Sequence, residues 1–352
     1  MTKMMNALYA ESVSSFRMTQ RPLPQPKHGE VLVKVKSCGI CHTDVMIRAG
    51  KAGHVKYPFI PGHEFSGVIT ECGEGVKYLR PGQRGVIQQI LNCGFCKPCK
   101  AGEPLCLCEN FTELGCILDG GMAEYCVVPA THFLPIPDSM SFDEAACVEP
   151  LANACSAVRE SRIRANDTVV IIGPGAIGIL AANVARLSGA GKIILAGTRD
   201  ARLSLAKESG FGVDETVNVR KDGAEDYLAE TLLGGRGADV VIDAAGSLSA
   251  LKLGFRILAP GGRLILEGTP FPEDVVPFNM FSLPNEASVK RVAGWSASDF
   301  LNAKTYIESK RIDVSPIITH RYPFSQWETG FDKAVHDKDS AIKVVLYQEN
   351  EV

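Results

Sequence analysis

The sequence lacks a long hydrophobic run and lacks an excess of charge of either sign. Its most apolar stretch, 169–185, is interrupted by glycines and a proline, whereas a membrane span needs about 20 apolar residues in succession. The first ten residues lack the apolar core of a secretory signal peptide. Lys and Arg total 37 and Asp and Glu total 40, a formal net charge of −3. Neither a membrane nor nucleic acid is therefore expected as a partner.

Residues 156–352 contain no cysteine; all 12 cysteines lie between Cys38 and Cys155. Without a secretory signal, this number of cysteines indicates a reducing compartment, which we take to be the cytoplasm. In such a compartment clustered thiols are metal ligands more often than they are disulfides. Any metal chemistry therefore belongs to the first part of the chain.

The two parts of the chain also differ in their patterns of apolar residues, and the length fits two domains. The first part alternates polar and apolar residues, as in 30–36, which predicts short β-strands. From Asp167 on, apolar runs alternate with helical patterns, which predicts a doubly wound parallel sheet with helices on both faces. The tail from about 297 lacks this rhythm, so we expect it to return to the first domain. The elements expected in the second part are strands at 169–172, 192–196, 216–219, 239–242 and 262–266, and helices near 176–187, 201–209, 224–233 and 248–258.

A dinucleotide-binding turn is predicted at Gly173-Pro-Gly-Ala-Ile-Gly178, which directly follows a strand and opens a helix. In this motif Gly173 permits the tight turn, Gly175 lets a pyrophosphate approach the backbone, and Gly178 lets helix and strand pack closely. The N–H groups of Ala176 and Ile177 begin the helix, where the helix dipole favours phosphate. An ordinary glycine-rich turn is the alternative interpretation.

The residues that end the second strand decide between NAD and NADP. An acid is expected there in NAD-binding proteins, but Gly197 occupies that position. Thr198 follows, and Arg199 and Arg202 offer positive charge for a 2′-phosphate, so NADP is favoured over NAD. Alternatively, both arginines are solvated and Asp200 contacts the ribose.

A second cluster, Cys93-x2-Cys96-x2-Cys99, is followed by Cys106 and Cys108. Thiolates at such short spacing converge on one tetrahedral ion, which suits Zn²⁺, and four thiolates leave no open position for a substrate. We therefore predict a structural zinc, although an empty reduced loop is the alternative. The spacing leaves the fourth ligand open between Cys106 and Cys108.

Several motifs in order resemble the zinc-dependent medium-chain dehydrogenase/reductase family over nearly the whole length. Glu149-Pro150 resembles the polyol (sorbitol) and threonine dehydrogenase branch. In that branch a glutamate replaces the cysteine ligand of ordinary alcohol dehydrogenases, and Glu149 occupies this position. The motifs are C-G-I-C-H-T-D at 38–44, G-H-E at 62–64, the cysteine loop at 93–108, D-G-G-x-A-E-Y at 119–125, V-E-P-L at 148–151 and the dinucleotide turn.

The resemblance implies a GroES-like β-barrel catalytic domain at both chain ends, 1–155 with 297–352, and an inserted Rossmann domain, 156–296. It implies a catalytic zinc held by Cys41, His63 and Glu149, with Glu64 as a permanent or exchanging ligand.

The resemblance also assigns roles to three residues near that zinc. Asp44 would orient the imidazole of His63, Thr43 would pass the substrate proton toward solvent, and Lys343 would reach the cofactor. For the structural zinc we prefer Cys108 as the fourth ligand, because 107–110 resembles the family's usual setting for that residue.

The implied function is reversible hydride transfer between a secondary alcohol, such as a polyol or sugar alcohol, and NAD(P), by a homodimer or homotetramer. One rival is a zinc-independent quinone or enoyl reductase of the same fold. A second rival is a zinc-ribbon module that binds nucleic acid, but the cysteine loop offers only Lys97, Lys100 and Phe95 as basic or aromatic residues.

Overall fold

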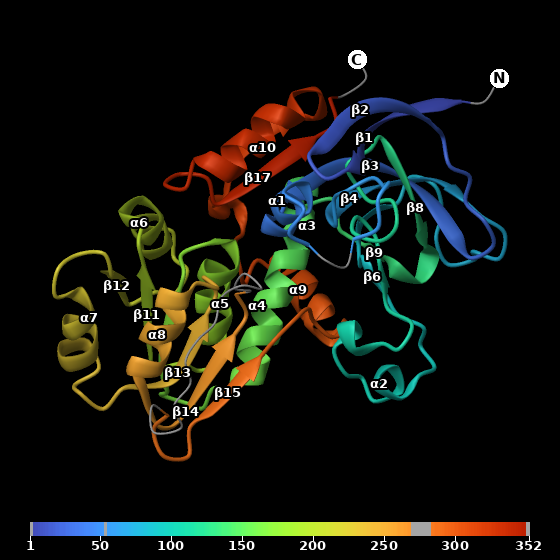
Figure 1. The fold of residues 1–352 in the computed structure, drawn as a ribbon. Helices are drawn as coiled ribbons and strands as arrows, with labels where there is room; N and C mark the ends of the chain where they lie inside the picture. The colour runs from blue at the N-terminus through green and yellow to red at the C-terminus, as the bar shows by residue number, and fades with distance from the viewer. Residues whose placement is uncertain (1–2, 53–54, 269–282, 350–352) are drawn as a thin grey trace. The chain divides into compact units, whose positions relative to one another are not determined.

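The computed structural model describes residues 3–52, 55–268 and 283–349 (Figure 1). The chain forms two compact units, one made of 1–149 with 296–352 and the other of 150–295. The first junction lies inside helix α4 (Val148–Ser161), a few residues before the junction predicted after residue 155. The second junction lies one residue before the predicted one.

The second unit is built on a six-stranded sheet in which every neighbouring pair is parallel. Its strand order is β12-β11-β10-β13-β14-β15, which is that of a dinucleotide-binding sheet. The central strand β10 is buried at consecutive positions, as a strand covered on both faces requires. The bounds are β10 Thr168–Ile172, β11 Lys192–Gly197, β12 Glu215–Asn218, β13 Ala238–Asp243, β14 Leu258–Leu266 and β15 Ser288–Arg291.

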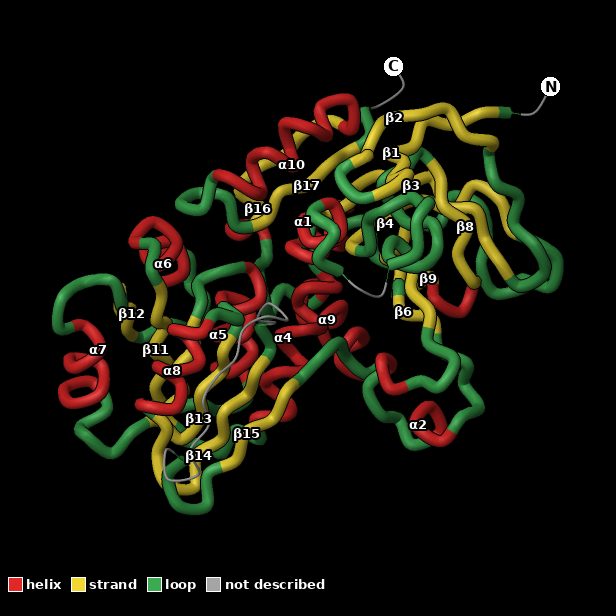
Figure 2. Tube along the Cα trace, viewed as in Figure 1, coloured by secondary structure: helices red, strands yellow, loops and turns green. Residues whose placement is uncertain are grey.

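Helices alternate with these strands along the chain (Figure 2). They are α5 Ala176–Leu187, α6 Asp200–Glu208, α7 Ala224–Asp226 and α8 Leu248–Arg256. The helix predicted near 224–233 is divided, because α7 continues as a π-helical segment, Tyr227–Leu232. Its apolar residues still reach the core: Leu228 is fully buried against the sheet, in the same cluster as Leu253 of α8.

The first unit is built on a seven-stranded sheet of order β16-β17-β3-β4-β5-β9, with β8 also paired to β3. The long strand β3 pairs antiparallel with β4, β8 and β17. The alternation predicted for 30–36 holds only over 33–36, because Val31, Leu32 and Val33 are buried in succession. The strands are β1 Met4–Ser12, β2 Ser15–Pro22, β3 Glu30–Ile40, β4 Glu64–Cys72, β5 Arg84–Ile87, β6 Ile90–Leu91, β7 Thr112–Glu113, β8 Tyr125–Pro129, β9 Phe133–Pro135, β16 Ile318–Pro323 and β17 Lys343–Tyr347.

The C-terminal residues belong to the first unit because β17 pairs with β3, Val344 opposite Ile40. Leu346 of β17 and Phe331 of α10 are both fully buried in the same core as β3. The helices of this unit are α1 His42–Arg48, α2 Lys97–Lys100, α3 Phe142–Ala146, α9 Ala297–Glu308 and α10 Trp327–His336.

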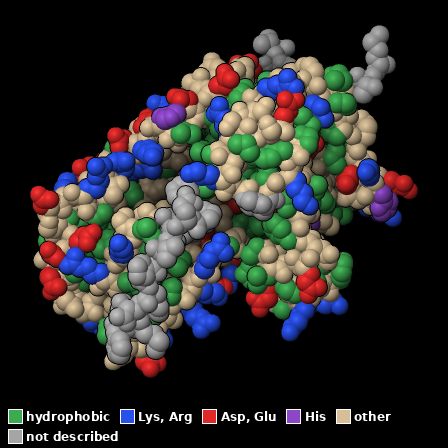
Figure 3. Space-filling view, viewed as in Figure 1, with side chains coloured by type: hydrophobic (Ala, Val, Ile, Leu, Met, Phe, Trp, Pro, Cys, Tyr) green, Lys and Arg blue, Asp and Glu red, His purple; other side chains and the backbone are tan. Residues whose placement is uncertain are grey.

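On the face drawn in Figure 3, both positively and negatively charged side chains lie on each unit. Among the described residues, no helix is long and apolar enough to cross a membrane.

Candidate functional site

Cys41, His63 and Glu64 lie together because two paired strands end at the same place. β3 ends at Ile40, just before Cys41, and β4 begins at Glu64, just after His63. The register puts Gly39 opposite Glu64. One ligand atom of each of the three residues lies within 4.8 Å of the others. A thiolate, an imidazole and a carboxylate form a donor set that suits a catalytic zinc.

Glu64 is held by Lys343, whose Nζ donates to its two carboxylate oxygens at 2.7 and 2.6 Å. Both residues are buried. Burial alone would lower the pKa of Lys343, but the charge of Glu64 raises it. A Cβ at Gly39 would stand 2.1 Å from Glu64 Oε2, so only glycine leaves room for this ion pair. The predicted contact of Lys343 with the cofactor stays a prediction.

Asp44 is fully buried beside His63. One of its carboxylate oxygens accepts the Cys41 N–H at 2.9 Å, and the other lies 3.8 Å from His63 Nδ1, beyond hydrogen-bond range. Burial alone would lower the pKa of His63, but the negative charges of Asp44, Cys41 and Cys116 raise it. The same negative charges would attract a metal cation, so the surroundings of His63 fit the predicted zinc.

Thr43 and Glu149 are the other residues predicted for catalysis. The hydroxyl oxygen of Thr43 lies 3.6 Å from the Cys41 sulfur. Glu149, at the start of α4, is 6% exposed and lies outside the group of three. Its Oε1 accepts a hydrogen bond from Gln89 Nε2 at 2.9 Å. The structure therefore holds Glu149 through a partner that the sequence analysis did not single out.

The cysteine loop brings four thiols together: Cys93, Cys96, Cys99 and Cys108. Their sulfur atoms are 3.3 Å apart for Cys96 and Cys99, and 4.0 Å apart for Cys96 and Cys108. Four thiolates on one zinc, at about 2.3 Å each, stand about 3.8 Å from one another. The loop therefore fits a tetrahedral zinc. Cys106, the alternative fourth ligand, is not part of this group.

Hydrogen-bond donors surround these sulfur atoms. The backbone N–H of Cys93 and that of Asn110 donate to Cys108 Sγ at 3.3 and 3.4 Å. Desolvation alone would raise the pKa of Cys93, but the N–H groups of Phe95 and Cys96 lower it to about 6. Donors of this kind stabilise thiolate, the form of cysteine that binds metal.

The turn between β10 and α5 has the geometry predicted for a dinucleotide. Gly173 has φ +109°, and a Cβ there would lie 2.9 Å from the Ala245 nitrogen. A Cβ at Gly178 would lie 2.0 Å from the Gly173 carbonyl oxygen, whereas a Cβ at Gly175 would meet nothing within 4 Å. The open space at Gly175 is where a pyrophosphate is expected, next to the N–H groups of Ala176 and Ile177.

The end of β11 cannot hold an acidic side chain without rearrangement. A Cβ at Gly197 would stand 2.4 Å from Pro174 Cδ, so the proline of the turn occupies that space. Thr198 is exposed, and Arg199 and Arg202 are half-buried. Asp200, the alternative ribose contact, instead accepts a hydrogen bond from Asn218 Nδ2 at 2.9 Å.

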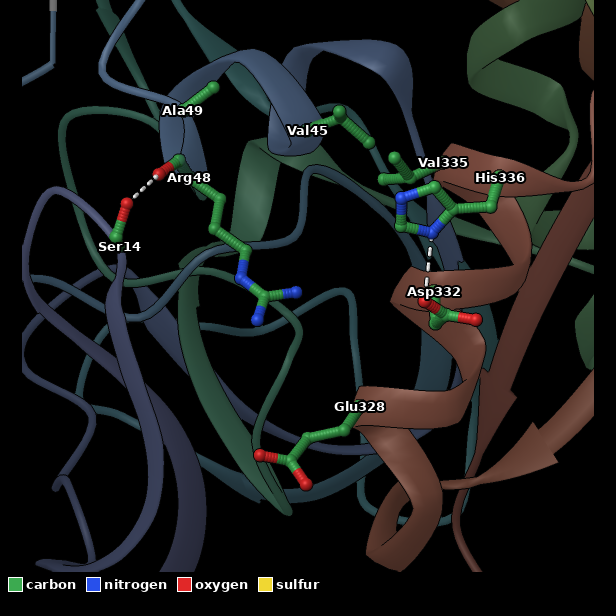
Figure 4. A pocket seen from close by; sticks show the side chains of 8 residues that line it. All are labelled: Ser14, Val45, Arg48, Ala49, Glu328, Asp332, Val335 and His336. Atoms are coloured by element: carbon green, nitrogen blue, oxygen red, sulfur yellow. Dashed lines mark hydrogen bonds and ion pairs between the residues drawn. The ribbon is translucent and has the colours of Figure 1, made fainter.

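A depression of about 490 Å³ lies elsewhere in the first unit, between α1 and α10 (Figure 4). Charges of both signs line it, and Figure 4 shows the His336 ring paired with the Asp332 carboxylate. The Arg48 guanidinium lies over the rings of Trp327 and Phe331, at 5.5 and 5.6 Å from their centroids. It is lined by none of the residues predicted for metal or cofactor binding.

Comparison with known proteins identifies both units. Residues 27–138 match the family described as the alcohol dehydrogenase GroES-like domain, and residues 176–308 match the family described as zinc-binding dehydrogenase. A sorbitol dehydrogenase of Halalkalibacterium halodurans is 33% identical over 335 residues, which make up 94% of this chain and 95% of that protein.

Two solved structures are similar over almost the whole chain. A putative zinc-binding dehydrogenase of Sinorhizobium meliloti 1021, bound to NADP, has a TM-score of 0.90 and 30% identity, covering 98% of this chain and 99% of that one. A protein described as a short chain alcohol dehydrogenase (rspB) of Escherichia coli CFT073, complexed with NADH, has a TM-score of 0.88 and 31% identity at the same coverage. The chain belongs to the zinc-dependent medium-chain dehydrogenase/reductase family.

Membership of the medium-chain dehydrogenase/reductase family confirms the predicted fold class, a GroES-like β-barrel domain with an inserted Rossmann domain. The zinc-binding loop is accordingly part of a dehydrogenase rather than a separate nucleic-acid module. Sequence reasoning missed two residues of the site, Gly39 and Gln89. Gly39 lies within the C-G-I-C-H-T-D motif, of which only the donor residues were predicted to act, and no motif contains Gln89.

Proposed function

We propose that this protein catalyses reversible hydride transfer between a secondary alcohol and NAD(P), with zinc held by Cys41, His63 and Glu64. The observation that carries the proposal is the convergence of these three donors within 4.8 Å in a chain that also has a dinucleotide turn. In the forward direction the alcohol carbon gives a hydride to the nicotinamide and the hydroxyl gives up a proton, which leaves a ketone.

The protein's own residues position these groups and move the proton. When bound, zinc supplies Lewis acidity toward the substrate oxygen. Thr43, with its hydroxyl near the Cys41 sulfur, is proposed to take the proton on its way to solvent. Asp44, whose carboxylate lies 3.8 Å from His63 Nδ1, is proposed to orient that imidazole, and Lys343 fixes Glu64 where it can ligate or exchange.

Glu149 is proposed as a further carboxylate of the zinc site. Glu64 is paired through both oxygens to Lys343, and Glu149 accepts a hydrogen bond from Gln89 at its Oε1. The cysteine loop is proposed to hold a second, structural zinc through Cys93, Cys96, Cys99 and Cys108.

The substrate is proposed to be a polyol, a sugar alcohol or a similar hydroxylated secondary alcohol. The relative from H. halodurans is named a sorbitol dehydrogenase, and Glu149 resembles the residue of the polyol and threonine dehydrogenase branch. We further propose a homodimer or homotetramer in the cytoplasm, as the family resemblance and the cysteine usage lead us to expect.

NADP is proposed as the preferred cofactor. The proline that fills the space at Gly197 removes the usual place for an acid that would bind a 2′-hydroxyl and repel a 2′-phosphate. Arg199 and Arg202 supply positive charge to the same loop. One similar structure holds NADP and the other NADH, so the preference rests on these residues of the chain.

The test is a panel of polyols and simple secondary alcohols assayed with NAD and NADP in parallel, together with the zinc content per chain. The proposal expects turnover of secondary alcohols that is lost in Glu149→Ala, while NADPH binding is retained. Wild-type rates in that variant would remove Glu149 from the mechanism. Activity that survives complete zinc removal would favour the zinc-independent reductase instead.

A further inference from the structure

The nitrogen and the oxygen of the Gln89 side-chain amide have different surroundings. Gln89 is 1% exposed. Its Nε2 donates to Glu149 Oε1 at 2.9 Å, whereas its Oε1 is buried and accepts no hydrogen bond from the residues that the structure describes. Buried amide oxygens are nearly always paired, so an unpaired one points to a donor that arrives with a ligand.

The orientation of this amide follows from the chemistry of its neighbour. A carboxylate only accepts hydrogen bonds, so the NH₂ end of Gln89 must face Glu149, and the carbonyl end must face away. The group that would pair with Gln89 Oε1 is therefore a hydrogen-bond donor. A hydroxyl group of a substrate is such a donor, whereas a ketone or an ether oxygen is not.

The backbone of Gln89 is also linked to the proposed zinc site, through the segment 114–116. Its carbonyl oxygen accepts the Leu114 N–H at 3.0 Å. Two residues further on, the sulfur of Cys116 lies 3.8 Å from His63 Nδ1. The backbone at Gln89 is thus anchored beside the segment that contacts one proposed ligand, while its side chain holds another proposed residue of the site, Glu149.

We infer that Gln89 positions Glu149 and accepts a hydrogen bond from a second hydroxyl group of the substrate. The inference rests on the proposed function and narrows it, because it selects alcohols with a hydroxyl next to the reacting carbon over simple secondary alcohols. A site that pairs a substrate hydroxyl discriminates against an analogue that lacks it, because the buried partner is then left unpaired.

Gln89→Met removes both polar ends at similar volume, and Gln88→Met is the matched control, since Gln88 is the adjacent glutamine and is also buried. We compare kcat/KM for 2,3-butanediol and 2-butanol. Gln89→Met is expected to lower kcat/KM for the diol about ten-fold more than for the mono-alcohol, a loss typical of one hydrogen bond. Gln88→Met should leave the ratio of the two substrates unchanged.

A second readout does not depend on turnover. In cobalt-substituted protein, the visible spectrum reports the ligands of the metal, and its change on titration with the diol gives an apparent Kd. Gln89→Met should shift the spectrum, through Glu149, and weaken diol binding about ten-fold while 2-butanol binding is unchanged. If Gln89→Met does not fold, Gln89→Asn, which shortens the same amide, is expected to show the same loss of preference.

The outcomes separate this inference from the proposed function. If the wild-type protein turns over neither alcohol with either cofactor, the proposed function is wrong. If it turns over both, and Gln89→Met leaves their kcat/KM ratio and the cobalt spectrum as in wild type, the inference about Gln89 alone is wrong. Equal loss on both alcohols would overturn the second-hydroxyl contact and retain only the positioning of Glu149.

Discussion

At the residue scale, the proposed metal centre depends on charges that are buried and paired. Lys343 and Glu64 are both almost inaccessible to solvent, so neither charge is stable there without the other. An ion pair on the same C-terminal segment, Lys333 with Asp337, is only half-buried. The two pairs therefore differ in their effect on stability although both are lysine–carboxylate contacts.

Replacing Lys343 with methionine is expected to lower the free energy of unfolding of metal-free protein by about 3–5 kcal/mol, because Glu64 becomes an uncompensated buried charge. Lys333→Met, the control, should change the free energy of unfolding much less, because solvent screens its ion pair with Asp337. Denaturant unfolding of both variants measures the difference. Equal effects of the two substitutions would show that the Glu64–Lys343 contact is not a buried ion pair in solution.

The residues of the site were predictable where a motif marks them. Cys41, His63 and Glu64 lie in short runs whose donor types suit zinc, and the structure brings them together. Gln89 lies in no such motif, and within its motif Gly39 has no donor atom that would single it out. The roles of both residues depend on neighbours distant in sequence: Glu149 lies 60 residues after Gln89. A long-range contact of this kind is decided by tertiary packing rather than by local pattern.

At the element scale, the cysteine loop has only short secondary structure of its own. It contains the four-residue helix α2, and Phe95 and Leu107 are largely exposed, at 67% and 54%. Little apolar surface is therefore buried within the loop, so a bound zinc is the main source of order that we expect for it.

Cys108→Ser is expected to remove one zinc per chain and to make the loop sensitive to proteolysis, because three thiolates no longer close the tetrahedron. Cys106→Ser is the matched control and should keep full zinc content. Elemental analysis and limited proteolysis of both variants test the assignment. The reverse pattern, with zinc lost only from Cys106→Ser, would make Cys106 the fourth ligand.

The short helix α3 provides a pH test. Ser141 Oγ accepts the Glu144 N–H at 3.1 Å, and a Glu144 oxygen accepts the Ser141 N–H at 2.7 Å. Although desolvation raises the pKa of Glu144, hydrogen bonds from Ser141 and the charge of Lys310 lower it below its usual 4.5. Ionised Glu144 therefore stabilises the fold above pH 4.5, and this contribution is lost as pH falls through the lowered pKa.

Glu144→Gln should be less stable than wild type by about 0.5–1 kcal/mol at pH 7, and the difference should shrink as pH falls below 4.5 through the lowered pKa. Thermal unfolding of both proteins from pH 7 to pH 3 measures how their stability difference changes with pH. A difference between Glu144→Gln and wild type that persists at pH 3 would mean that the carboxylate charge is not its source.

Helices and strands were predictable where the spacing of apolar residues along the chain is regular. The helix 176–187 and the buried strand at 169–172 are found within a residue of their expected bounds. The division of the helix near 224–233 into α7 and a π-helical segment was not predictable, since a π-turn keeps the same apolar residues and changes only their hydrogen bonds. Edge strand β15 carries four exposed residues and has no apolar signal.

At the scale of the whole molecule, one unit is assembled from both ends of the chain and the other is continuous. The discontinuous unit holds both proposed metal sites, and the continuous unit holds the dinucleotide turn. Each chemical component of the proposed reaction thus belongs to a separate unit. Removing the catalytic zinc should therefore leave cofactor binding to the second unit intact.

The most direct test is the zinc content per chain, measured with turnover and NADPH binding, in wild-type protein and in Cys41→Ser. The account predicts two zinc ions in the wild type and one in Cys41→Ser, which should bind NADPH normally and show no turnover. A Cys41→Ser protein that keeps both its zinc and its activity, or an active wild type without zinc beside Cys41, would contradict the account.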